Sequence, residues 1–294
     1  LPDMKKLRPC KVDGNIDKGM NKNTQDEVFG RLQKFFEQPW RREGDYVIVT
    51  ETYTPWKSGF AGSLHSAKGS QGVYRPIRSH LLALTEDLDM VCAMPTILVW
   101  VCKEFGIECP KLKHYVEHRE EVLTEFMKDV GCTRPHAKDQ FNTAWTFDKP
   151  MTKGGCTKNP FFTEYDAEAK SVQAKLMARS ELQWMLRYCK EEGNNRAGSF
   201  VSHVFHFVQS QLLDRVMKLK KEAVQCIVFD GLNIRKNSLH ADEALMARRC
   251  LSAACEEVCP GIQMKWAWKA LDYDVRTKDT QRFVKTLTIP DDFA

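Results

Sequence analysis

Apolar residues recur along this chain with two periods, one of about 3.6 residues and one of two, which predict helices and strands respectively. Helical spacing is seen at 24–38, 95–106, 112–127, 133–145, 166–192, 199–220 and 239–259. Strand-like runs are seen at 46–52, 81–90, 224–234 and 263–270. Because the strands lie far apart in the sequence, the pattern predicts an α+β fold.

Acidic residues stand at the ends of two of the predicted strands. Asp87 and Asp89 close one strand, just before a helix that begins at Pro95. Asp230 and Gly231 form the tip of a predicted hairpin. Hard divalent cations require carboxylate oxygens, so acids from two strands could bracket a pair of metal ions. Asp-Gly is also an ordinary hairpin turn, and an acidic strand end can simply be solvated, so these readings stay open.

The segments between these elements divide the chain. Residues 1–23 are polar and rich in lysine, which indicates an arm. Thr24 and Glu27 form a capping box at the start of the first helix. The Gly- and Ser-rich stretch 57–72 is basic and predicts a loop, and 146–160, with its Pro and Gly residues, predicts a linker.

Composition narrows the class of protein. The chain has 294 residues, 43% hydrophobic and 28% charged, and can bury a substantial core. No run approaches the roughly 18 consecutive apolar residues of a membrane span, so we expect no membrane partner. The 11 cysteines include no CxxC pair, and no apolar stretch follows the basic residues near the N-terminus. We therefore expect reduced thiols and an intracellular, reducing compartment, with nucleus, organelle and virus-associated sites all open.

Four segments of the chain form an ordered set of possible motifs. They are DLDMVCAMPTIL at 87–98, LKHYVEHREEVLTEF at 112–126, TRPHAKDQF at 133–141, and AGSFVSHVFHFVQSQLLDRV followed by QCIVFDGLNI. In this order they resemble motif A, a helix, motif B and the approach to motif C of one branch of family A DNA polymerases, known from viruses and mobile elements. The resemblance spans about residues 60–272.

This resemblance implies a right-hand polymerase core, with a palm of antiparallel sheet, helices on one face of it, and helical fingers. The implied division is an N-terminal arm and helix at 1–44, a first palm segment at 45–106, fingers at 107–160 and a second palm segment at 161–294. The implied reaction adds deoxynucleoside triphosphates to the 3′ hydroxyl of a primer on a template. Two Mg²⁺ ions would serve it, with Mn²⁺ as a substitute, and the implied partner is primer-template nucleic acid.

The resemblance also implies site residues by their positions. Metal binding is assigned to Asp89 and Asp230, with Asp87 as a further candidate. The primer-template backbone is assigned to Arg75 and Arg78, and the template and primer terminus to Asn195 and Arg196. We expect the basic loop 57–72 to contact the nucleic-acid backbone as well.

Independently of the resemblance, Arg134 and Lys138 lie four residues apart in a predicted helix and share one face of it. Arg offers a bidentate fork and Lys a point charge, so this face could bind a triphosphate. We expect Lys138 to contribute to catalysis by stabilising charge on the departing pyrophosphate. The formal net charge of +5 permits a polyanionic partner, and a solvated helix face is the alternative reading.

Departures from the family pattern keep other functions open. Cys92 and Met94 stand where the branch usually has Asn and His, Gly231 replaces an acid, and motif B ends in TAWTFDKP without Tyr-Gly. The main alternative is a catalytically inactive palm that serves as a structural or nucleic-acid-binding subunit of a larger complex. A metal-dependent nuclease with the same acids is a third reading. His203 and His206 are predicted as packing residues of an apolar helix.

Overall fold

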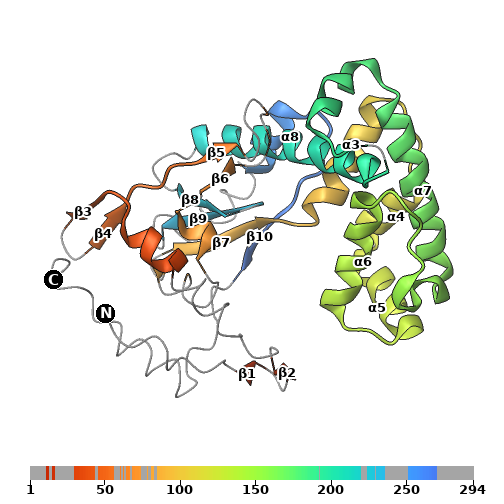
Figure 1. The fold of residues 1–294 in the computed structure, drawn as a ribbon, viewed down its shortest axis with the longest axis horizontal. Helices are drawn as coiled ribbons and strands as arrows, with labels where there is room; N and C mark the ends of the chain where they lie inside the picture. The colour runs from red at the N-terminus through yellow and green to blue at the C-terminus, as the bar shows by residue number, and fades with distance from the viewer. Residues whose placement is uncertain are drawn as a thin grey trace.

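A computed structural model gives the fold of the chain (Figure 1). The structure describes residues 11–12, 15–16, 30–43, 46–55, 60, 62, 64–66, 68–73, 78, 81–82, 85–191, 193–219, 224–228, 230–235 and 251–269. Some predicted features lie outside these residues, namely the capping box of Thr24 and Glu27, Arg75, and the first half of the helix at 239–259. Its residues 251–258 are helical.

A four-stranded antiparallel sheet, in the order β10-β7-β9-β8, lies at the centre of the described chain. Its strands are β7 (Thr85–Met90), β8 (Val224–Val228), β9 (Gly231–Arg235) and β10 (Trp266–Lys269). On one face of the sheet, Leu88 lies opposite Leu232 and both are fully buried. On the other face, Asp87 lies opposite Asn233 and Asp89 opposite Gly231. The apolar face therefore anchors the sheet in the core, while the second face carries the acids.

Two long helices connect the sheet to a helical group on the other side of the molecule (Figure 1). Helix α3 (Ala93–Glu104) follows β7 after a two-residue turn, and α8 (Arg196–Leu219) precedes β8. The helical group consists of α4 (Pro110–Glu117), α5 (Arg119–Val130), α6 (Arg134–Thr146) and α7 (Pro160–Met177). α8 packs against α3, α6 and α7, so the sheet and the helical group share one hydrophobic core.

Phe141 of α6 is the centre of an aromatic cluster inside the helical group. Its ring stacks on Tyr115 at a centroid distance of 4.5 Å, and meets Phe126, Phe162 and Tyr165 edge-on at 5.2, 5.1 and 4.9 Å. All five rings are buried. Such ring pairs stabilise a core beyond their buried area, so α6 is held in a fixed rotation that presents its opposite face outward.

The C-terminal carbonyl groups of α6 have side-chain partners from neighbouring helices. Lys170 Nζ donates to the carbonyl of Ala144 at 2.6 Å, and Gln173 Nε2 donates to those of Trp145 and Phe147 at 2.8 and 3.0 Å. The carbonyl of Thr146 accepts a hydrogen bond from Asn195 Nδ2 at 2.9 Å. These donors satisfy groups that a helix end leaves without intrahelical partners. Helix α6 can therefore end without a glycine cap.

Short elements precede the sheet. They are β1 (Lys11–Val12), β2 (Asn15–Ile16), a helix at 30–36, β3 (Trp40–Glu43), β4 (Tyr46–Val49), β5 (Thr54–Pro55), β6 (Leu64–His65) and a 3₁₀ turn, η2 (Ser70–Gly72). Side chains of this region form hydrogen bonds with the edge strand β8. The Tyr53 hydroxyl accepts from the Ile227 amide and donates to the Ile227 carbonyl, both at 3.1 Å, and Gln71 Nε2 donates to the same carbonyl at 3.1 Å. Glu51 Oε2 lies 2.8 Å from the same hydroxyl and competes with the Ile227 carbonyl for its one proton.

The structure confirms the α+β class and corrects several predicted boundaries. The helix predicted over 112–127 is two helices, because His118 has φ −119° and ψ 32°, outside the helical region. The helix predicted over 166–192 begins at Pro160 and ends at Met177. Beyond it, Arg179 is extended and donates to the carbonyl of Phe105, and a 3₁₀ segment, η4 (Ser180–Tyr188), follows.

Three further predictions are corrected. The strand predicted over 81–90 begins at Thr85. The predicted loop 57–72 contains β6 and η2, and the linker 146–160 contains another 3₁₀ segment, η3 (Lys153–Lys158). Among the described residues, no helix is both long and apolar enough to cross a membrane.

The contact between α6 and α8 depends on a glycine. A Cβ atom built on Gly198 would lie 2.2 Å from the carbonyl oxygen of Thr146. We expect Gly198→Ala to destabilise the protein by about 1–3 kcal/mol, because the two backbones must separate. The control is Gly30→Ala, since Gly30 is helical and a Cβ atom added there would meet nothing within 4 Å. Urea unfolding of both variants tests this, and equal stability of the two would contradict it.

Candidate active site

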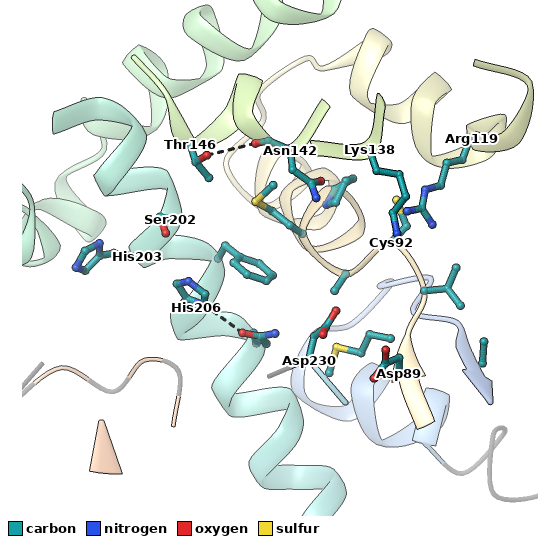
Figure 2. A pocket seen from close by; sticks show the side chains of 18 of the residues that line it. Asp89, Cys92, Arg119, Lys138, Asn142, Thr146, Ser202, His203, His206 and Asp230 are labelled. Atoms are coloured by element: carbon teal, nitrogen blue, oxygen red, sulfur yellow. Dashed lines mark hydrogen bonds between the residues drawn. The ribbon is translucent and has the colours of Figure 1, made fainter. Parts of the chain in front are cut away.

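A cavity of about 760 Å³ lies where the sheet, α3, α5, α6 and α8 meet. Its floor is formed by the end of β7 and the β8–β9 turn, and α6 and α8 face each other across it (Figure 2). It brings together residues from all four motif segments of the sequence. A volume of this size is in the range of small-molecule binding sites.

The two principal acids both line this cavity. Asp89 is the second-last residue of β7, and Asp230 lies in the turn between β8 and β9. The amide of Met90 donates to the carbonyl of Asp230 at 3.2 Å, which ties the turn to the end of β7. Figure 2 shows the two carboxyl groups on the same side of the cavity. The structure thus brings together two acids that are far apart in the sequence.

Gly231 makes room for the Asp89 carboxylate. A Cβ atom on Gly231 would lie 1.9 Å from Asp89 Oδ1 and 3.2 Å from the carbonyl oxygen of Leu88. Any larger residue would therefore push the carboxylate out of its place. This gives a physical reason for a glycine at this position.

Burial raises the pKa of Asp230, and the charge of Asp87 raises it further, while Lys138 lowers it. Asp87 is 8% exposed and lies on the same face of β7 as Asp89, but it does not line the cavity. Asp87 therefore acts on Asp230 through its charge, from a position next to the cavity. A third carboxylate near Asp230 favours a bound cation, because a cation would relieve the repulsion.

One face of α6 lines the opposite wall. Arg134, Lys138, Asn142 and Thr146 recur every four residues along it, and all four line the cavity. Burial lowers the pKa of Lys138, and the charges of Arg119 and Arg134 lower it further. The predicted shared face of Arg134 and Lys138 is therefore present, and it is directed at the cavity that holds the acids.

Arg119 is a cation of this site that the sequence analysis missed. It is the first residue of α5, lines the cavity, and forms a side-chain hydrogen bond with Tyr115. The sequence contains it in the run His-Arg-Glu-Glu, where its neighbours are charged and it looks like an exposed residue. The break between α4 and α5 turns it inward, and no periodic pattern of apolar residues indicates such a break.

α8 supplies the remaining wall, with Ser202, His203, Phe205, His206 and Gln209. Burial lowers the pKa of His206, whose Nδ1 lies 3.2 Å from Gln209 Oε1. The sequence predicts both histidines as packing residues, and His203 does contact the buried ring of Phe60 at 5.0 Å. They nevertheless face the cavity, which the apolar spacing of α8 does not reveal.

Other predicted residues lie elsewhere. Asn195 joins α6 to α8, since its Oδ1 accepts from the amide of Asp148 at 2.8 Å, and neither it nor Arg196 lines the cavity. Arg78 is 9% exposed and its charge acts on the Cys226 thiol of β8, away from the cavity lining. Arg75 lies outside the described residues. In the predicted basic loop, Ser66, Ser70 and Gln71 are buried, whereas Lys68 is exposed.

The donor set at the floor of the cavity consists of two carboxylates. Within the described part of the chain, no group of three or more His, Cys, Asp or Glu side chains could hold a metal ion. Mg²⁺ at phosphate-transferring sites is commonly held by one or two carboxylates together with substrate phosphates and water. Asp89 and Asp230 fit this mode of binding.

Comparison with known proteins finds a distant relative. No family model and no solved structure matches the chain. The chain is similar to the "Putative helicase V13" of the Sputnik virophage, with 22% identity over 210 residues. The match covers 67% of this chain and 27% of that protein, so the chain spans much less than the full length of this relative. The phosphate-binding pattern G-x-x-x-x-G-K-[ST] does not occur in the sequence.

The raised pKa of Asp230 predicts how stability depends on pH. Between the ordinary value of 3.8 and the raised value, the folded protein binds this proton more tightly than the unfolded chain does, so stability falls as the pH rises through that window. At neutral pH and without metal, we expect Asp230→Asn to have a higher Tm than the unmodified protein. The difference should shrink as the pH falls below the ordinary value of 3.8, because the Asp230 carboxyl group is then largely neutral in both the folded and the unfolded state.

Thermal unfolding across pH in the presence of a chelator measures this difference. Asp214→Asn is the control, because Asp214 is exposed and paired with Lys218 on α8. Added Mg²⁺ should raise the Tm of the unmodified protein and leave that of Asp230→Asn unchanged. A lower Tm for Asp230→Asn at neutral pH would show that its charge stabilises the fold.

Proposed function

We propose that the chain is the palm and fingers core of a template-dependent nucleotidyltransferase that extends a primer 3′ hydroxyl with deoxynucleoside triphosphates. One observation carries this proposal. Asp89 at the end of β7 and Asp230 in the β8–β9 turn share a cavity with Lys138 and Arg119, which lie on the opposite wall. Phosphoryl transfer needs acids for metal ions and cations for phosphates within one site, and little other chemistry from the protein.

In this proposal Asp89 and Asp230 hold Mg²⁺, and Mn²⁺ could substitute for it. The bound metal ions would activate the attacking hydroxyl and neutralise charge on the transferred phosphate. Gly231 fixes the position of the Asp89 carboxylate by leaving it space, and the backbone bond from Met90 fixes the turn of Asp230. Asp87 keeps the electrostatic field at Asp230 negative and so favours cation binding.

The cationic wall completes the site. Lys138 is partly buried, and in a site with little water its charge interacts strongly with a phosphate. As the bond to pyrophosphate breaks, negative charge grows on the leaving group, and a fixed cation stabilises this state more than the ground state. Lys138 therefore acts on the leaving group, and the acids act on the attacking side.

The relative named as a putative helicase supports nucleic acid as the partner, because helicases act on nucleic acid. The absence of the P-loop pattern from the sequence gives no support for helicase chemistry in the matched segment. The order of the motifs along the chain supports the polymerase reading of the same cavity. Primer-template and deoxynucleoside triphosphates are thus the proposed substrates.

An inactive palm that binds nucleic acid within a larger assembly is the second candidate. Cys92 and Met94, which replace the usual residues of motif A, both line the cavity. Cys92 has a left-handed conformation with φ 55° and caps α3 without a side-chain hydrogen bond. Because both changes of residue type lie inside the cavity, they are not neutral surface substitutions. They favour altered or lost catalysis.

Primer extension separates these readings. We expect extension by the unmodified protein with Mg²⁺, and a loss of at least about 10³-fold in Asp89→Asn or Asp230→Asn, since each removes a metal ligand. Glu86→Gln is the control, because Glu86 is an exposed acid on the opposite face of the same strand. Degradation of the primer without nucleotides would identify a nuclease. Binding of primer-template without extension under any condition would identify an inactive palm.

The role of Lys138 predicts a specific kinetic change. Lys138→Ala should lower the maximal rate of single-turnover extension by about 10²-fold, and primer-template affinity should change little. Lys128→Ala is the matched control, because Lys128 is an exposed lysine of α5 that does not line the cavity. An unchanged maximal rate with only a weaker nucleotide affinity would limit Lys138 to ground-state binding.

A further inference from the structure

The two arginines on the cationic wall differ in their partners. Arg134 forms a bidentate ion pair with Glu120, with Nε to Oε2 at 3.1 Å and Nη2 to Oε1 at 2.7 Å. Arg119 forms no ion pair within the described part of the chain, and its Nε is buried without a hydrogen-bond partner there. The guanidinium of Arg134 is therefore bonded to an acid, whereas the guanidinium of Arg119 has donor capacity that a ligand could use.

The charge of Glu120 favours the cationic form of Arg119, but both carboxylate oxygens of Glu120 are bonded to Arg134. The other neighbours of Arg119 include the Tyr115 hydroxyl, the Cys92 thiol and Lys138. Figure 2 shows Arg119 and Lys138 converging on Cys92. Arg119 and Lys138 are both cationic and partly removed from water, so an anion bound between them would relieve their mutual repulsion.

The start of α3 adds to the same positive region. Cys92 is the N-cap of this helix, Ala93, Met94 and Pro95 belong to its first turn, and all four line the cavity. Pro95 has no N–H group and so offers no amide donor. A helix N-terminus carries a partial positive charge and unpaired amide groups that attract anions. The first turn of α3 contains no acidic residue that could offset this positive charge. Two cations and a helix N-terminus therefore face one region of the cavity.

We propose that Arg119, together with Lys138, forms the resting phosphate subsite for the nucleoside triphosphate, and that Glu120 withholds Arg134 from it until a ligand competes for that guanidinium. This inference rests on the proposed function for the identity of the ligand. Arg119 is prepared for the ligand by its bond to Tyr115, whose ring is stacked in the aromatic cluster around Phe141. Arg134 and Glu120 are largely exposed, so a buried phosphate can displace this acid at small cost.

Binding of inorganic tripolyphosphate and of dATP, measured by calorimetry without primer-template, tests this assignment. Arg119→Ala should weaken binding about 10- to 100-fold, because a charge-assisted hydrogen bond is lost. Arg134→Ala should change it by less than about threefold, in line with an exposed pair. Glu120→Gln should strengthen binding severalfold by releasing Arg134, and the double variant Glu120→Gln, Arg134→Ala should lose this gain.

Further variants make the result unambiguous. Arg215→Ala is the matched control for charge, because Arg215 is also paired with a glutamate, through Nε and Nη2 to Glu257 Oε2, and does not line the cavity. Arg119→Lys should bind with intermediate affinity, since it keeps the charge and loses the fork. If Arg119→Ala does not fold, as judged by circular dichroism, Arg119→Lys and Glu120→Gln still decide the question.

The outcomes also separate this inference from the polymerase proposal. Loss of affinity in Arg134→Ala together with unchanged affinity in Arg119→Ala or Arg119→Lys would overturn the assignment of Arg119. If the unmodified protein binds tripolyphosphate through Arg119 but never extends a primer, the subsite stands and the polymerase proposal fails. If it extends primers and Arg119 variants do so with unchanged nucleotide affinity, the polymerase proposal stands and the subsite fails.

Discussion

The pairing of β7 with β9 is the constraint on which the candidate site depends. Its register places Asp89 opposite Gly231, and so next to Asp230 in the preceding turn. A shift of one residue would move the acids of β7 to the apolar face, where Leu88 and Leu232 now meet. Burial of these two leucines therefore fixes the position of both carboxylates. The core of the sheet and the geometry of the acids are specified by the same contacts.

The position of the cationic wall depends on a second set of contacts. α6 is fixed in rotation by the rings around Phe141 and fixed at its C-terminus by Lys170, Gln173 and Asn195. Its polar face is thereby directed at the cavity. The N-terminal end of α6, in contrast, meets α5 through the exposed pair of Arg134 and Glu120. Helix α6 is thus held more firmly at the end far from its cations.

Much of this arrangement could be predicted from local patterns. The hairpin at Asp230 follows from Asp-Gly between apolar runs, and α6 follows from its apolar spacing. The break at His118 could not be predicted, because the residues on both sides of it have helical spacing. This break decides the direction of Arg119. Asn195 could not be placed either, since its role in capping α6 depends on a contact between two helices that are distant in the sequence.

The outer edge of the sheet is partly protected from pairing with another molecule. Strand β8 is the outer strand of the sheet, and such strands can recruit a strand from another molecule. At Ile227 the amide and carbonyl groups are already engaged by Tyr53 and Gln71, two side chains of the same molecule. A strand added from another chain would have to displace both of them. The phenol and the amide thus protect the middle of this edge from intermolecular sheet growth and aggregation.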